Sequence, residues 1–537
     1  MEWGKHLLVA PVLLPLVAGA CLLLIDELRH TLKAVVSLFS TLALFAVSAI
    51  LLSMADSQGG DTLAMSYAVA NWPAPFAIVL VLDRLSALLM VTSSVLALAA
   101  LVFSLARWDR AGPHFHSLFQ FLLMGLGGAF LTGDLFNLFV FFEVTLAASY
   151  GLLLHGSGSF RVRSGLHYIS INLAASLLFL IGVSLIYGVT GTLNMADLAL
   201  RIPQVTPDDR ALLQVGAGIL GIAFLVKAGM WPLGFWLPPA YMAAAAPVGA
   251  IFVILTKVGV YVILRLSLLL FGGASGELAG FGNMALLWGG IATLLFATSG
   301  VLASQAMGRL AGYSVLISSG TLLAAVGLGN ASVVSGALFY LVSSTFAAAA
   351  LFMLIELVER AREPGADLLT VTMEAYGDER EETDEPEDEE VGVIMPGALA
   401  ILGVSFGCIA LLLAGLPPLS GFAAKFAMLK GMLDGLPDGS GIPAHVWVVV
   451  ALIILSGLAA LVAMMRTGIR TFWAPLETVL PRVLVIEVAP ILALIGLCLA
   501  MTVYGGALIR YTDAASTALH EPGAYVRGVL SGEGGVR

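Results

Sequence analysis

Four ionisable side chains lie deep inside apolar stretches that are long enough to cross a membrane. They are Glu143, in "TGDLFNLFVFFEVTLAASYGLLLH", and three lysines, Lys227, Lys257 and Lys425. A charged side chain at the centre of a bilayer costs roughly 2.5–3.5 kcal/mol on insertion scales, so such residues are rare and mark ion routes. Removal from water favours the neutral form of a lysine, whereas a nearby carboxylate favours the charged form. A row of such groups can therefore take up protons and pass them on.

The structural alternative is that one lysine neutralises Glu143. Three central lysines exceed what a single carboxylate needs, and apolar residues separate each of them from either surface. The remaining charges have simpler interpretations. Asp83 and Arg84 are adjacent near the start of a span, so we expect a structural ion pair or an interfacial anchor. Arg265 and Lys430 are expected to extend to the membrane surface.

The composition requires elements that cross a membrane many times. The chain has 537 residues, of which 59% are hydrophobic and 11% charged, against about 25% charged residues in soluble domains. Fifteen apolar stretches are candidate spans. They cover residues 6–25, 34–54, 76–105, 117–132, 135–154, 168–189, 212–236, 243–270, 279–302, 311–328, 332–357, 393–415, 417–433, 444–465 and 483–509.

Prolines and glycines interrupt two of these helices beside the lysines. "LVKAGMWPLGFWLPP" follows Lys227, and "GLPPLSGFAAKFAML" contains Lys425, so we join 393–415 and 417–433 as one broken span, which leaves fourteen. Proline removes an amide donor and frees carbonyls that can bind water or ions. Broken helices at corresponding places in two halves indicate an inverted-repeat transporter. The prediction is an all-α polytopic membrane protein with two inverted five-helix repeats.

Loop charges support fourteen spans and give an orientation. The bases on one side of the membrane are Arg29, Lys33, Arg107, Arg110, Arg161, Arg163, Arg309, Arg360, Arg362, Arg466 and Arg470. The positive-inside rule places this side in the cytoplasm and both termini outside it. The net charge of −10 resides in residues 374–390, within a loop at 358–392 that is then cytoplasmic. The expected location is a bacterial inner membrane.

The expected domains are residues 1–110 with three helices, 117–270 and 279–465 as the two repeats, and 466–537 as the last helix and tail. "GAGILG" at 216–221 matches a dinucleotide-binding pattern, but it lies inside an apolar helix rather than after a strand. No sequence pattern for a nucleotide, haem, iron–sulfur or other metal site is present, so no cofactor is expected. Nothing indicates nucleic acid as a partner.

Four stretches resemble the proton-translocating antiporter-like membrane family. They are "TGDLFNLFVFFE", "KAGMWPLGFWLPPAYMAAAAPVGAIFVILTKVGVYVILR", "ASQAMGRLAGYSVLISSG" and "GLPPLSGFAAKF". The resemblance covers about residues 76–475. This family includes large subunits of Mrp-type (also Mnh or Pha) cation/proton antiporters, and subunits of respiratory complex I and of membrane-bound hydrogenases. The chain most resembles the D subunits of the Mrp type.

The resemblance implies a glutamate–lysine pair, here Glu143 and Lys227, followed by Lys257 and Lys425 along a water-linked proton path. Asp134, Ser343 and Ser344 are auxiliary candidates. Many relatives have a histidine in the seventh-span segment, where this chain has Gly234 and Tyr241, and one in the eleventh span, where it has Ser343, Ser344 and Ala348. A hydroxyl orients water but does not titrate near neutral pH, so the link from Lys257 to Lys425 needs hydroxyls and ordered water.

Three functions remain open at this point. The first is a proton-translocating subunit of a multisubunit Na⁺(K⁺)/H⁺ antiporter, which is a secondary transporter and not an enzyme. The second is the proton-pumping subunit of a redox-driven complex, either an NADH dehydrogenase or a hydrogenase. The third is a membrane scaffold without transport. The first two predict other subunits as partners, besides the lipid bilayer, H⁺ and, for the antiporter, Na⁺ or K⁺.

Overall fold

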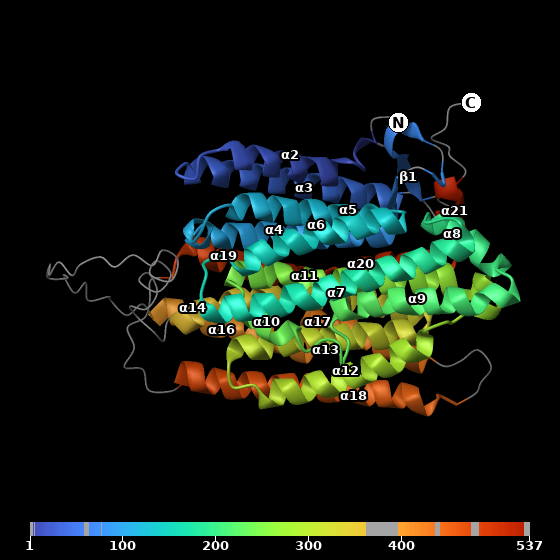
Figure 1. Cartoon of the computed structure of the whole chain (residues 1–537). Helices are drawn as coiled ribbons and strands as arrows, with labels where there is room; N and C mark the ends of the chain where they lie inside the picture. The colour runs from blue at the N-terminus through green and yellow to red at the C-terminus, as the bar shows by residue number, and fades with distance from the viewer. Residues whose placement is uncertain are drawn as a thin grey trace.

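The computed structural model describes residues 4–530 apart from residues 5, 58–63, 73, 77, 361–395, 435–440 and 474–482. Its long helices run side by side, so the molecule has two ends (Figure 1). Strands β1 (Met65–Ala68) and β2 (Val79–Leu82) mark one of them, the hairpin end. The last turn of α14 (Ala331–Arg360) lies at the opposite end.

The other elements alternate long helices with short connecting ones. In chain order they are α2 (Ala10–Leu24), α3 (His30–Ser57), η1 (Val69–Asn71), α4 (Arg84–Ser104), η2 (Trp108–Arg110), α5 (Phe115–Leu131), α6 (Leu135–Leu153), α7 (Ser159–Thr190), α8 (Met195–Arg201), η3 (Ile202–Gln204), α9 (Pro207–Ala228), α10 (Leu237–Ala243), α11 (Ala246–Phe271), η4 (Gly273–Leu278), α12 (Asn283–Ala303), α13 (Met307–Leu328), α16 (Pro396–Ala414), α17 (Ser420–Leu433), α18 (Ala444–Gly468), η5 (Ile469–Trp473), α19 (Val485–Val503), α20 (Gly505–His520) and α21 (Gly523–Leu530).

The helices match the predicted spans. Within the described residues, eleven helices are long and apolar enough to cross a membrane, and three shorter apolar helices, in α2, α5 and α16, accompany them. Each of the fourteen predicted spans overlaps one of these helices. The predicted polytopic helical membrane fold is therefore confirmed. The acidic segment 374–390 lies outside the described residues, and α14 continues to Arg360, two residues beyond the predicted start of the loop.

The two halves run in opposite directions. The first half begins with α5 at the α14 end of the molecule and closes with α11, whose last turns reach the hairpin end (Figure 1). The second half begins there with α12 and closes with α18 at the α14 end. Each half contains one interrupted helix, α9–α10 in the first and α16–α17 in the second. This is the inverted-repeat arrangement that the paired proline segments predict.

A glycine in the left-handed conformation ends the first piece of each interrupted helix. Gly229 (φ +75°) follows α9, and Gly415 (φ +74°) follows α16. This conformation is common at helix C-termini because glycine adopts it without a steric penalty. At Gly415 an added Cβ would also clash with the side chain of Lys425, at 2.5 Å from its Cδ atom. The two breaks thus place helix C-termini, with free carbonyl groups, inside the bundle.

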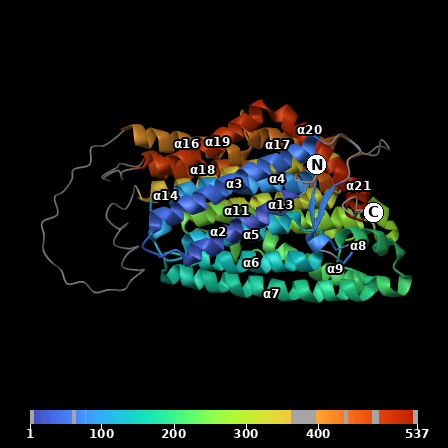
Figure 2. The same ribbon diagram turned by 90° about the horizontal axis from the view of Figure 1, so that it is seen from above.

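Two central helices form the core between the halves. Nearly every residue of α11 and α14 is buried. In Figure 2, α7 lies along one edge of the bundle and α16, α19 and α20 along the opposite edge, with α11 between them. The "GAGILG" segment lies within α9, where Gly216 packs against α7 at Gly182. Its glycines serve helix packing, as expected for apolar spans.

The structure adds elements that the apolar pattern does not reveal. Strands β1 and β2 pair in antiparallel fashion before α4, and β2 lies within the stretch predicted as the third span. The predicted last span continues through α19 into α20, which follows α14 back to its start, where Ser516 Oγ donates to Ala331 O at 2.7 Å. Helix α21 then contacts the hairpin, since Ser66 Oγ donates to Gly528 O at 2.9 Å.

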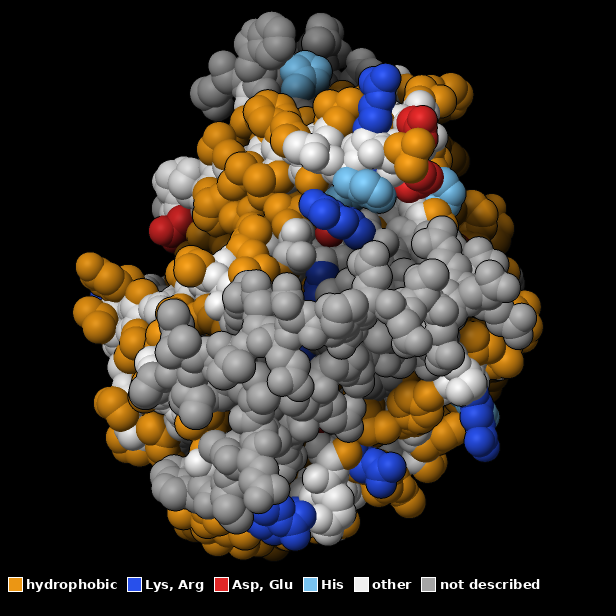
Figure 3. Space-filling view, turned by 90° about the vertical axis from the view of Figure 1, so that its left-hand side faces the viewer, with side chains coloured by type: hydrophobic (Ala, Val, Ile, Leu, Met, Phe, Trp, Pro, Cys, Tyr) orange, Lys and Arg blue, Asp and Glu red, His pale blue; other side chains and the backbone are white. Residues whose placement is uncertain are grey.

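Polar contacts join several of the basic residues at the α14 end, which we call the basic end. Trp108 Nε1 and Arg107 Nε donate to Glu356 at 2.7 and 3.1 Å, linking the segment after α4 to α14. Arg360 donates to Glu487 at 2.8 Å, linking α14 to α19. Figure 3 looks onto this end, where Lys and Arg side chains are visible among apolar ones. Arg107 and Arg360, which the sequence places on the same side of the membrane, thus lie at the same end of the molecule.

Candidate functional site

Glu143 and Lys227 lie on neighbouring elements near the middle of the bundle. Lys227 occupies the last turn of α9 and is 9% exposed. Its Nζ atom lies 4.9 Å from the centre of the ring of Phe142, the residue before Glu143 on α6. Among the described residues no ion pair joins Glu143 to Lys227, and Glu143 Oε1 is buried without a hydrogen-bond partner.

A small cavity of about 30 Å³ adjoins Lys227. Four polar side chains, besides the lysine, help to line it, and they are Thr145, Tyr168, Asn172 and Tyr241. A cavity needs about 10–15 Å³ of such volume to hold one water molecule, and the water needs polar partners. The cavity beside Lys227 meets both conditions. Its lining includes Leu255 and Val258 of α11, so the cavity reaches the helix that carries the next lysine.

Lys257 is fully buried on α11 and has a hydroxyl partner on α13. Its Nζ atom donates to Ser318 Oγ at 2.6 Å. The Ser318 hydroxyl is in turn 2.8 Å from Ser344 Oγ on α14. A buried ammonium group needs such a hydrogen bond, because it has lost its water. The contact also connects Lys257 to the next two helices.

A second hydroxyl pair continues the row toward α17. Ser343 Oγ on α14 lies 2.8 Å from Ser420 Oγ at the start of α17. Between the two hydroxyl pairs is a cavity of about 10 Å³, lined by Ser343 and Ser344 together with Tyr340 and Leu413. This volume is close to that needed for one water molecule. The hydroxyls therefore lead from Lys257 to the second broken helix.

Lys425 binds the end of that broken helix. Its Nζ atom donates to the carbonyl oxygens of Leu413 at 3.2 Å and Ala414 at 3.0 Å. These are among the last carbonyls of α16, which have no partner within their own helix. A cation near a helix C-terminus is also favoured by the helix dipole. The break thus frees carbonyls beside this lysine, as expected, and in the structure the lysine itself donates to them.

The result is a buried row of ionisable and hydroxyl side chains across the bundle. It runs from α6 and α9 through α11, α13 and α14 to α17. Figure 2 shows α6 and α9 toward one side of the bundle and α17 toward the other. Ser318 and Ser420 belong to it although the sequence reasoning did not select them. Hydroxyls are common in apolar helices, so their residue type alone carries little signal. Among the described residues, no cluster of three His, Cys, Asp or Glu side chains could hold a metal ion.

Asp134 lies apart from this row. Its carboxylate accepts from Asn137 N at 2.9 Å and caps the N-terminus of α6. Glu143 is nine residues further along the helix, about 13 Å away at 1.5 Å per residue. A carboxylate at this position stabilises the helix start. The structure therefore gives Asp134 a capping role and does not bring it to the lysines.

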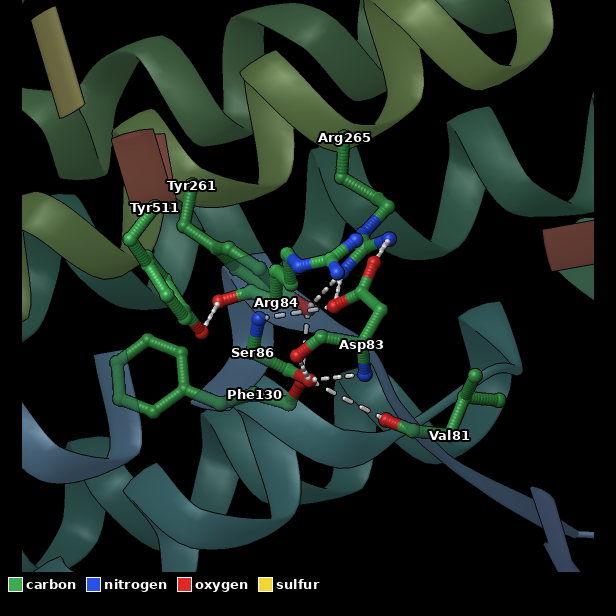
Figure 4. A network of polar contacts seen from close by, with 8 residues as sticks. All are labelled: Val81, Asp83, Arg84, Ser86, Phe130, Tyr261, Arg265 and Tyr511. Atoms are coloured by element: carbon green, nitrogen blue, oxygen red, sulfur yellow. Dashed lines mark hydrogen bonds and ion pairs between the residues drawn. The ribbon is translucent and has the colours of Figure 1, made fainter. Parts of the chain in front are cut away.

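Asp83 and Arg265 form a buried ion pair near the hairpin end (Figure 4). Arg265 is 5% exposed and binds both carboxylate oxygens, so the expectation that it extends to the membrane surface is wrong. Asp83 is thus in a structural ion pair, one of the two expected alternatives, and its partner is Arg265, whereas Arg84 approaches Asp56 at 3.9 Å. The sequence suggested an adjacent pair because it does not reveal that α11 packs against α4. Lys430 is exposed, as expected.

Comparison with known proteins shows the family to which the chain belongs. The family described as "NADH:quinone oxidoreductase/Mrp antiporter, TM" matches residues 132–458, which include all four buried charges. The chain belongs to this family. The D subunit of a probable K⁺/H⁺ antiporter of Rhizobium meliloti is 59% identical over 534 residues, which cover 99% of this chain and 98% of the relative. The D subunit of a Na⁺/H⁺ antiporter of Alkalihalophilus pseudofirmus is 31% identical over 98% of this chain and 99% of the relative.

Solved structures of similar proteins have the same fold. A chain in the structure of the Mrp complex from Dietzia sp. aligns with a TM-score of 0.81 at 26% identity, covering 99% of this chain and 100% of that chain. A chain of respiratory complex I from Thermus thermophilus aligns with a TM-score of 0.75 at 23% identity, covering 96% of this chain and 99% of that chain. The second likeness concerns the fold alone.

Proposed function

We propose that this chain is the D-type, proton-translocating subunit of a multisubunit Na⁺ or K⁺/H⁺ antiporter. The observation that carries the proposal is the buried row, in which Lys257 donates to Ser318 and hydroxyls lead on to Lys425. Buried ionisable groups at this depth are expensive and are retained where ions move. The similarity to the D subunits of K⁺/H⁺ and Na⁺/H⁺ antiporters supports the same function.

In this proposal protons move along the row between the two broken helices. Glu143 sets the charge state of Lys227, because its negative charge favours the protonated lysine. The proton passes through the cavity beside Lys227 to Lys257, and from there to the hydroxyl of Ser318. Each hydroxyl accepts one proton and releases another, so that the net charge moves without a titrating histidine. Ser344, a water molecule in the 10 Å³ cavity, Ser343 and Ser420 complete the path to Lys425.

The chain works with other subunits in a bacterial inner membrane, and Na⁺ or K⁺ moves in exchange for H⁺ under the driving force of an ion gradient. The basic end faces the cytoplasm and the termini lie on the other side, and by its position in the sequence the loop at 358–392 is also cytoplasmic. These assignments rest on loop charges and on the family. Accessibility labelling of cysteines placed at either end would test the orientation.

The second candidate function is the pumping subunit of a redox-driven complex. The observation that favours it is the fold shared with complex I. Purification from the native membrane separates the two functions. Co-purification of small antiporter subunits with this chain would support the antiporter function. Co-purification of iron–sulfur and quinone-binding subunits would instead support the function in a redox-driven complex. Cation-driven proton movement by the purified complex, lost in a Lys257→Ala variant that still assembles, would then test the role of the row.

A further inference from the structure

A second group of buried ionisable side chains lies at the basic end, away from the row. Asp109 in η2, His116 in the first turn of α5 and His155 just after α6 are each only 4–6% exposed. Phe115 packs against both histidine rings, at 5.5 Å from His116 and 5.0 Å from His155 between ring centres. The group therefore joins the turn before α5 to the turn that follows α6.

Asp109 and His116 face each other without a complete hydrogen bond. His116 Nε2 lies 3.7 Å from Asp109 Oδ2, beyond the roughly 2.7–3.2 Å of a normal N–H···O bond. Both ring nitrogens of His116 and Asp109 Oδ1 are buried without a hydrogen-bond partner among the described residues. A buried carboxylate and a buried imidazole without partners are costly. One proton on the imidazole, with a shift of about 0.5–1 Å, would turn them into a charge-assisted hydrogen bond.

Most of the charged groups on the surrounding elements are engaged elsewhere. Arg110 is the exception, with Nε at 4.0 Å from Asp109 Oδ1, and its side chain is 65% exposed, so water screens this contact. Burial lowers the pKa of His155, although its hydrogen bond to Trp108 O at 2.7 Å and the charge of Asp109 oppose this effect. The other neighbours have partners of their own. They are Arg107 with Glu356, Arg161 with Ala243 O, and Lys33 and His114 with Glu27.

We propose that Asp109 and His116 form a proton-binding site at the basic end, whose occupancy fixes the α4–α5 turn against the start of α5. The ligand is a single proton shared by one carboxylate and one imidazole. When the proton is bound, the α4–α5 turn is held to the first turn of α5. When the proton is absent, the buried carboxylate of Asp109 has lost its imidazolium partner, which weakens this contact and the packing of Phe115 between the two histidines.

The site can influence the row through helix α6, which carries Glu143. Helices α5 and α6 pack closely, since a Cβ added to Gly125 of α5 would lie 2.2 Å from Thr145 Oγ1 of α6. Thr145 also lines the cavity beside Lys227. A change at the start of α5 therefore reaches the wall of that cavity. This part of the inference rests on the proposed transport function, whereas proton binding by Asp109 and His116 does not.

Histidine hydrogen–deuterium exchange at the imidazole Cε1 position tests the site directly in the assembled complex. The exchange rate of each histidine peptide, followed by mass spectrometry across about pH 5 to 9, gives its titration midpoint. With Asp109→Asn, the exchange profile of His116 should move to lower pH, because its negative partner is lost. His114, which pairs with Glu27 and is half exposed, serves as the internal control and should not shift.

A His116 midpoint that is the same with and without Asp109 would overturn the proposal, whatever the transport activity. The transport arm compares His116→Asn with His114→Asn in everted vesicles, where the basic end faces the medium. His116→Asn should change the ratio of activities at about pH 6 and pH 8 at least two-fold, and His114→Asn should leave it unchanged. If the two variants had equal pH 6 to pH 8 activity ratios while the exchange profile of His116 still depended on Asp109, the site would bind a proton without influencing transport. Loss of all transport in wild type would count against the proposed function and leave the exchange result standing.

Discussion

The Nζ atom of Lys257 lies 2.6 Å from the hydroxyl oxygen of Ser318, and both residues are buried. This contact joins the two halves of the chain, because Lys257 is on α11 of the first half and Ser318 is on α13 of the second. The contact also begins the link from Lys257 to Lys425, for which the sequence offered no titrating group. A hydroxyl can pass on a proton only if it is hydrogen-bonded on both sides, and Ser318 meets this condition through Ser344.

The first prediction therefore concerns Ser318. Ser318→Ala removes the acceptor of a buried ammonium group and interrupts the hydroxyl path, so cation-driven proton movement should fall at least about ten-fold. Ser318→Thr keeps the hydroxyl and should retain more activity. Ser319→Ala is the matched control, since Ser319 is adjacent and fully buried, and its hydroxyl has no hydrogen-bond partner among the described residues. Equal activities in the two alanine variants would remove Ser318 from the path.

The second prediction concerns Glu143. Glu143→Gln keeps the shape of the side chain but removes the negative charge that favours protonated Lys227, so transport should drop strongly while the complex still assembles. The pH optimum of the residual activity should be lower by about one unit, because a higher proton concentration is then needed to protonate Lys227. Glu143→Asp should keep more function. A pH scan in everted vesicles decides, and wild-type activity with an unshifted optimum in the Gln variant would show that the charge does not tune Lys227.

The third prediction distinguishes proton transfer from fixed charge. Lys227→Arg and Lys257→Arg keep a positive charge, but arginine remains protonated and cannot release its proton. Transport should remain at least about ten-fold below wild type in each variant. Immunoblots of the purified complex check assembly. Full activity in the arginine variants would mean that the row needs only positive charge.

The fourth prediction concerns Asp83 and Arg265. Asp83→Asn leaves a buried guanidinium group without its counter-charge, and breaking a buried ion pair in this way costs about 3–5 kcal/mol. We expect a lower melting temperature of the solubilised complex and less assembled complex in the membrane. Asp56→Asn is the control, because Asp56 is largely exposed and lies 3.9 Å from Arg84. If the two variants were equally stable, the pair would not hold α4 to α11.

The spans and the buried charges could be predicted from the sequence because both depend on composition along one helix at a time. Lys227, Lys257 and Lys425 are charged residues in apolar stretches, and Gly415 with the prolines after it gives the position of a break. Contacts between distant helices could not be predicted in this way. The pairing of Asp83 with Arg265 depends on how α4 packs against α11, and the two residues are 182 positions apart in the chain.

The hydroxyl path shows the same limit. The sequence drew attention to Ser343 and Ser344 only because relatives have a histidine nearby. Ser318 and Ser420 became part of the site when α13 and α17 were seen to pack against α14. The role of Asp134 in capping α6 is a local feature, and its position just before the helix could have predicted it.

The central claim is that protons move along the buried row, and α17 offers the most direct measurement. Lys425 and Lys430 are on the same helix, the first 6% exposed and bonded to the α16 carbonyls, the second exposed. Cation-driven proton movement is measured in everted vesicles with equal amounts of assembled complex. The account predicts that Lys425→Ala reduces it at least about ten-fold and that Lys430→Ala leaves it at the wild-type level. Wild-type transport by Lys425→Ala would contradict the account.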